Sequence, residues 1–204
     1  WLMYLLILLL CALTLVRRKE LLYGALMSVL VLAGMHTWKL VERQRQNFLI
    51  VYSAPPYTAI AHIYGNEAKI IFDQRLLQNK SAMLFHVTHH WWQCGITKTE
   101  NLQEETSLPF GKLYNIQGRK FLLADSATIL PKHWDHKPLQ VDYMVITNSI
   151  KISPQKLLAV VNPSEIIFDT GNKTYYHKKW RKAIAEKRIP YTNVSDTGAR
   201  IISL

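Results

Sequence analysis

Two long apolar runs open the chain, one over residues 1–16 and one over residues 21–35. A helix that crosses the roughly 30 Å hydrocarbon core of a bilayer needs about 20 apolar residues, and the second run reaches that range if it extends to Trp38. Neither run shows the polar stripe of a helix on the surface of a soluble domain. We therefore predict a transmembrane helical hairpin over residues 1–38, at the end of a larger membrane domain. The alternatives are a buried hairpin of a soluble domain and a secretory signal peptide, although no basic region precedes the first run.

From residue 47 onward, short strand patterns alternate with helical patterns. The turns at Gly65-Asn66 and Gln117-Gly118 each predict a β-hairpin. The predicted strands cover residues 47–53, 57–64, 67–73, 111–116, 120–125, 141–147, 165–169, 190–194 and 200–204. Helices are predicted over residues 76–93, 154–161 and 174–188, and a polar loop over residues 98–107. Strand–helix–strand units of this kind are typical of an α/β domain, which we place at residues 45–204.

The chain carries a large excess of positive charge. Lys and Arg total 25 against 14 Asp and Glu, which gives a net charge of +11. Most of this excess lies after residue 38, so it belongs to the α/β domain. Such a charge favours anionic partners, namely nucleic acid, anionic lipid or a polyphosphate. The two flanks of the second apolar run carry equal charge, so the positive-inside rule does not orient the hairpin.

The helix predicted over residues 174–188 is amphipathic. Its apolar face holds Tyr176, Trp180, Ala183 and Ile184, and its opposite face holds Lys178, Lys179 and Lys182. A basic helix face can bind nucleic-acid phosphates without sequence preference. We predict a DNA-binding surface formed by Lys178, Lys179, Arg181 and Lys182. The alternative is an ordinary solvated helix face.

The densest cluster of potential metal ligands is His86, His89, His90 and Cys94. On a helix, His86 and His90 share a face, as metal-binding pairs do. However, the spacing of the four residues matches no specific metal motif, and Trp91 and Trp92 beside them suggest packing. We interpret the segment as a partly buried aromatic helix with solvent-facing histidines, and keep a metal site as the alternative.

The order of these elements resembles the C-terminal part of the ComEC-type competence proteins, the inner-membrane channels of DNA uptake. In that family a metallo-β-lactamase-like domain follows the last membrane helices, and residues 45–204 take its place here. Thr88-His89-His90-Trp91-Trp92 only echoes the metal-ligand motif Thr-His-x-His-x-Asp-His, because the Asp-His pair is missing. Thr147-Asn148-Ser149 stands where His-His-Gly-Ser is expected. The strand ending in Asp125 and the stretch up to His177 do match metal-ligand positions of the family.

The resemblance therefore implies a degenerate αββα-type domain that has lost its metal. A catalytic zinc needs about three protein ligands and an open position for water, and the matched positions supply only Asp125 and His177. We expect no cofactor and no catalytic residues. The alternative is a zinc- or manganese-dependent nuclease that degrades the non-transforming DNA strand, with a site assembled from His86, His89, His90, Asp125 and His177.

The resemblance also implies a location and a set of partners. It places the chain in the cell inner membrane as a multi-pass protein, with an extracytoplasmic domain and the turn 17–20 on the cytoplasmic side. The expected partners are single-stranded DNA, membrane lipid, other proteins of the competence machinery and the N-terminal part of the same protein. A third hypothesis is a structural role in which the basic helix lies on anionic lipid.

Overall fold

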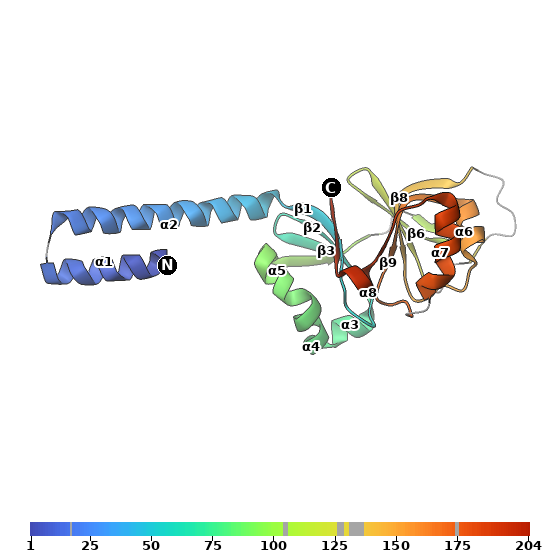
Figure 1. Ribbon diagram of the computed structural model, residues 1–204, viewed down its shortest axis with the longest axis horizontal. Coiled ribbons are helices and arrows are strands. Elements are labelled where there is room, and N and C mark those ends of the chain that lie inside the picture. Colours follow the sequence, from blue (N-terminus) through green and yellow to red (C-terminus); the bar gives the residue numbers. More distant parts are fainter. Residues whose placement is uncertain (17, 104–105, 126–128, 131–136, 174–175) are drawn as a thin grey trace. The chain divides into compact units, whose positions relative to one another are not determined.

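The computed structural model describes residues 1–204 except for 17, 104–105, 126–128, 131–136 and 174–175. The chain forms two compact units, Trp1–Gln46 and Asn47–Leu204. The first unit contains the helices α1 (Leu2–Val16) and α2 (Lys19–Arg45), which pack along each other. The second unit combines two β-sheets with helices (Figure 1).

Helix α2 has the length and composition of a membrane span. In the part of the chain that the structure describes, it is the one helix long and apolar enough to cross a membrane. It continues past the predicted end at Trp38 as far as Arg45, because Leu40, Glu42 and Arg43 favour helix. Helix α1 has 15 residues, which is fewer than the approximately 20 that span a bilayer. A membrane crossing by the first apolar run therefore stays a prediction.

The second unit contains a five-stranded sheet and a six-stranded sheet. The five-stranded sheet has the order β11 (Arg200–Ser203), β1 (Asn47–Val51), β2 (Ala59–Tyr64), β3 (Glu67–Phe72) and β4 (Lys98–Asn101). The six-stranded sheet has the order β10 (Tyr191–Asn193), β9 (Val161–Phe168), β8 (Leu139–Ile146), β7 (Arg119–Ala124), β6 (Gly111–Ile116) and β5 (Thr106–Leu108). Strands β7, β8, β9 and β10 are parallel neighbours, whereas β1, β2 and β3 are antiparallel. These observations confirm the predicted α/β class.

Helices cover the outer face of each sheet. The five-stranded sheet is covered by α3 (Gln74–Gln78), α4 (Lys80–Met83), the π-helix η1 (Leu84–Thr88) and α5 (His89–Cys94). The six-stranded sheet is covered by α6 (Pro154–Val160) and α7 (Tyr176–Lys187), and the short α8 (Val194–Thr197) connects the two sheets. The layers of this unit are thus helix, sheet, sheet and helix (Figure 1).

The hydrophobic core follows from strands that are apolar on both faces. On β1, Leu49 and Val51 belong to the cluster between the sheets, while Ile50 packs under the outer helices. On β9, Ile167 faces the other sheet and Phe168 faces α6 and α7. Strands buried on both faces are nearly continuous apolar runs, as this sequence has in the second half of the unit.

Several predicted bounds differ from the structure, including β9, which begins at Val161 and not at residue 165, and two elements differ most. The helix predicted over residues 76–93 begins at Gln74 and is interrupted at Asn79, whose side chain accepts a hydrogen bond from the backbone of Ala82 and starts α4. The loop predicted over residues 98–107 contains β4 and β5. Both are edge strands with mostly exposed side chains, so their polar sequences lack an alternating apolar pattern.

Candidate functional site

Helix α7 packs its apolar face on the six-stranded sheet. Tyr176, Trp180, Ala183 and Ile184 are buried, as the sequence predicted. The ring of Trp180 lies 5.9 Å from the ring of Phe168, and the hydroxyl of Tyr176 donates a hydrogen bond to the carbonyl of Ile150. Lys187 donates from Nζ to the carbonyl of Leu158 at 2.5 Å, which ties the end of α7 to α6. The helix is therefore held firmly at both ends and in its middle.

The opposite face of α7 is exposed and basic. Lys178, Lys179, Arg181 and Lys182 are all exposed, and none of them makes an ion pair with a described residue. Glu186 is the one acidic residue of the helix. Four cations on a rigid, solvated face form a surface of the kind that binds phosphates of a nucleic acid.

The histidine cluster is part of the packing of α5 on its sheet. The hydroxyl of Tyr52 lies 2.9 Å from Nδ1 of His90, and Sγ of Cys94 lies 3.5 Å from Nε2 of the same ring. Burial lowers the pKa of His90 and raises the pKa of Tyr52. His86 contacts Phe85 edge to face, and His89 is exposed. Within the described residues, His86 and His90 thus make their contacts with different side chains.

The residues that match metal positions of the family do not assemble a metal site. Asp125 follows β7 of the six-stranded sheet, and His177 lies in the first turn of α7. His86, His89 and His90 belong to the helical layer over the other sheet. Outside the masked positions, no group of three or more His, Cys, Asp or Glu side chains could hold a metal ion. These residues do not fit a catalytic zinc, which needs about three protein ligands.

A buried polar cluster that the sequence did not predict joins the two sheets. Asp169, directly after β9, is 1 % exposed, and its Oδ1 accepts hydrogen bonds of 3.1 Å from the backbone of Gly171 and from Nδ2 of Asn172. The hydroxyls of Thr58, before β2, and Thr147, after β8, are hydrogen-bonded to each other. A Cβ atom at Gly171 would meet both of these hydroxyls and Oδ1 of Asp169, at 3.0–3.3 Å. A side chain at position 171 would therefore require these groups to shift by a few tenths of an ångström.

The environment of Asp169 disfavours the charged form of its carboxyl group. Burial raises its pKa to about 6, although Thr58, Thr147 and the backbone of Gly171 act in the opposite direction. Its Oδ2 has no hydrogen-bond partner among the described residues. A small cavity of about 20 Å³ next to it is also lined by Lys173, His177 and Asp196, and this volume is enough for one water molecule. The sequence signal was a carboxylate at the end of a buried parallel strand, before Thr170-Gly171.

A comparison with family models decides the identity of this domain. The model of the ComEC C-terminal domain matches residues 49–204. The chain belongs to this family. Membership associates the chain with competence, with DNA uptake and with a membrane protein. The matched residues include α7 and the Asp169 cluster. Neither the curated proteins nor the solved structures gave a match.

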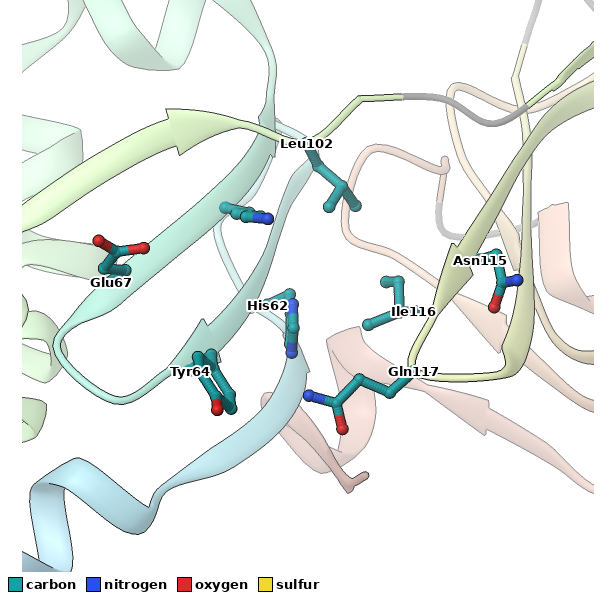
Figure 2. Close-up of a pocket in the computed structure, with 8 residues that line it drawn as sticks. His62, Tyr64, Glu67, Leu102, Asn115, Ile116 and Gln117 are labelled. Atoms are coloured by element: carbon teal, nitrogen blue, oxygen red, sulfur yellow. The ribbon is translucent and has the colours of Figure 1, made fainter.

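The ComEC C-terminal domain also has a cavity of about 420 Å³ between its two sheets (Figure 2). His62 and Tyr64 line it from one sheet, and Ile116 and Gln117 line it from the β6–β7 hairpin. Oδ1 of Asn47 lies 3.0 Å from Nε2 of His62, while Nδ2 of Asn47 donates to Gln117 at 2.7 Å. Burial and the nearby charge of Lys69 lower the pKa of His62. Because Oδ1 of Asn47 can only accept, Nε2 of His62 donates this hydrogen bond. These hydrogen bonds connect the two sheets beside the cavity.

Proposed function

We propose that residues 47–204 form a non-catalytic module of a DNA-uptake membrane protein, and that this module contacts single-stranded DNA through α7. The observation that carries the proposal is the exposed basic face of Lys178, Lys179, Arg181 and Lys182 on a helix whose opposite face is buried. Family membership supports DNA as the anionic partner. Phosphate contacts of this kind bind DNA without reading its sequence.

The proposal includes a fold and a membrane arrangement. The helix–sheet–sheet–helix layers and the matched family support a degenerate metallo-β-lactamase-like domain. The hydrophobic length of α2 supports insertion into the inner membrane. We further propose that α1 also crosses the bilayer, that the turn 17–20 is cytoplasmic and that the domain is extracytoplasmic. Its other partners would be membrane lipid, competence proteins and the N-terminal part of the same protein.

The salt dependence of DNA binding tests the role of α7. We expect the triple variant Lys178→Gln, Lys179→Gln and Lys182→Gln to bind single-stranded oligonucleotides more weakly. The slope of log K against log salt should fall by about 2, because each lost phosphate contact removes roughly 0.7 from the slope for a single strand. Fluorescence anisotropy of a labelled oligonucleotide, with the full chain in nanodiscs of neutral lipid, measures both quantities.

The matched control removes the same charge from other layers of the domain. Lys69, Lys80 and Lys120 are also exposed, and their triple change to Gln should leave the slope within experimental error of the wild type. Equal loss of binding in both triple variants would mean that net charge, and not α7, determines the affinity. Unchanged binding of the α7 variant would refute the proposed surface.

Metal content separates the proposed module from the nuclease alternative. We expect mass spectrometry of the purified full chain, dialysed against trace zinc and manganese, to give no stoichiometric metal. The reason is that Asp125, His177 and the histidines of α5 do not form a ligand set. One equivalent or more, together with DNA cleavage that is lost in Asp125→Asn and His177→Ala, would make the nuclease the correct assignment.

A further inference from the structure

The cavity between the two sheets has the size of a small-ligand site. Its volume is about 420 Å³, and ligand pockets typically measure roughly 300–1,000 Å³. Ile116, which is 4 % exposed, and the half-buried Leu102 give it an apolar lining. His62, Tyr64 and Gln117 add two rings and an amide (Figure 2). Pockets that bind ligands combine an apolar lining with a few polar groups that fix the orientation of the ligand.

Tyr64 provides an open aromatic surface in this cavity. It is the last residue of β2, and it is 58 % exposed. Its ring lies 6.5 Å from the ring of His62 and is tilted by 39° to it, so the two rings do not stack on each other. An exposed ring that a strand holds in place is a platform on which a planar ligand can stack.

The side chain of Gln117 is held beside this ring by a strained turn. Gln117 has a φ of 52° and forms the two-residue β6–β7 turn with Gly118. Asn, Asp and Gly dominate this turn position, because a larger side chain is strained in the left-handed region. The amide of Gln117 extends toward His62 and Tyr64 (Figure 2), and its Oε1 accepts the hydrogen bond from Asn47. Its Nε2 makes no hydrogen bond with a described residue and can donate to a ligand.

The charges at the rim of the cavity are balanced. Glu67 and Lys69 both line it. On the neighbouring strand β4, Lys98 lies 3.4 Å from Glu67 and 2.8 Å from Glu100, and Glu100 is paired with Lys69 in the register of the sheet. These two acids and two bases sum to zero. The cavity therefore suits an uncharged group and not a phosphate or a carboxylate.

We propose that this cavity binds one base of single-stranded DNA, which stacks on Tyr64 and accepts a hydrogen bond from Nε2 of Gln117. Every base has planar π-faces for stacking, and carbonyl oxygens such as O4 of thymine accept hydrogen bonds. A sugar ring can also pack on a tyrosine, but the association of the family with DNA uptake favours a base. The proposal rests on the proposed binding of DNA by the second unit. It adds an uncharged contact to the phosphate contacts of α7.

Removal of the ring tests the stacking. We expect Tyr64→Leu to bind an oligothymidine about tenfold more weakly, which is within the usual cost of one lost base–aromatic stack. The slope of log K against log salt should not change, because no phosphate contact is lost. Tyr64→Phe keeps the ring and should bind like the wild type. Anisotropy titrations of the full chain in nanodiscs of neutral lipid measure both quantities.

The matched control removes an exposed ring outside the cavity. Phe85 lies in the helical layer over the five-stranded sheet and is 77 % exposed. Phe85→Leu should change neither the affinity nor the salt slope. An equal loss of affinity in Phe85→Leu and Tyr64→Leu would refute a specific site at Tyr64.

A strand without bases distinguishes a base contact from a contact with the sugar–phosphate backbone. An oligonucleotide of the same length that is abasic throughout should bind equally to the wild type and to Tyr64→Leu. A tenfold difference between the two proteins on this strand would refute the proposal, because the ring would then contact the backbone.

The cavity and α7 can fail separately. Wild-type affinity in Tyr64→Leu, with a reduced salt slope in the triple lysine variant of α7, would refute the cavity site and keep the α7 surface. A loss in Tyr64→Leu, with unchanged binding of the triple variant, would support the cavity site and refute the α7 surface. No binding of DNA by the wild type would refute both.

Photo-crosslinking tests the contact in the wild-type chain. An oligonucleotide that carries 5-iododeoxyuridine should crosslink to Tyr64 on irradiation, and mass spectrometry of the digested protein identifies the residue. Crosslinks that map only to other peptides would contradict stacking on Tyr64.

Discussion

Replacing Trp180 by alanine lowers the free energy of unfolding of the second unit by about 3–5 kcal/mol, the range measured for large aromatic-to-alanine changes in protein cores. Trp180 is 0 % exposed, and its ring contacts the rings of Phe168 on β9 and of Tyr176 on α7. Its removal leaves a cavity under the middle of α7, because the rigid sheet cannot move in to fill it. Urea unfolding of the full chain in detergent, followed by circular dichroism, measures the change.

The matched control for this prediction is Trp180→Phe. The indole Nε1 of Trp180 has no hydrogen-bond partner within the described part of the chain, so its loss removes no hydrogen bond that the structure shows. Phenylalanine keeps most of the contact area, and we expect less than half of the destabilisation of the alanine variant. Destabilisation below about 1 kcal/mol in Trp180→Ala would mean that α7 is not anchored by this side chain.

Replacing Asp169 by asparagine stabilises the second unit at pH 8, by up to about 3 kcal/mol. Burial raises the pKa of Asp169 from 3.8 to about 6 in the folded state. The folded state therefore binds the proton more tightly than the unfolded state, and the ionised carboxylate destabilises the fold above pH 6. Each unit of pKa difference corresponds to about 1.36 kcal/mol, and the wild type regains this stability as the pH falls from 6 toward 3.8.

The pH dependence is the decisive part of this prediction. The stability difference between Asp169→Asn and the wild type should be largest at pH 8 and should shrink as the pH falls to 5. Urea midpoints at both pH values measure it, and Glu186→Gln, a change at an exposed carboxylate of α7, serves as the control. A variant that is less stable than the wild type at pH 8 would show that the hydrogen bonds to Gly171 and Asn172 need the charged carboxylate.

The sequence predicted those helices and strands of the second unit in which buried residues recur at a helical or strand spacing. The apolar face of α7 is the best example, because Tyr176, Trp180, Ala183 and Ile184 follow a helical spacing and all four are buried. The two hairpins were predicted from their turn residues, and the parallel strands β8 and β9 from their apolar runs. The edge strand β4 was missed because its residues are exposed on both faces.

The buried cluster around Asp169 was harder to predict, because its residues come from distant parts of the chain. Thr58, Thr147 and Asp169 are far apart in sequence, and only the pairing of the strands brings them together. The local signal, a carboxylate at the end of an apolar strand before Thr170-Gly171, does not by itself distinguish a buried carboxylate from an exposed one. The exposure of Lys178, Lys179, Arg181 and Lys182 was predictable from helical spacing, but their role in DNA binding stays a prediction.

The pairing of β1 with β11 also bears on how the domain is made. Leu49 pairs with Ile202 and Val51 with Arg200, so the first strand of the unit receives one of its two neighbours from nearly the last residues. A nascent chain emerging from the ribosome therefore holds β1 with an open apolar edge until almost the whole unit has been synthesised. Such edges recruit other chains. Premature termination shortly before residue 200 would therefore yield an aggregation-prone product, although every other strand would be complete.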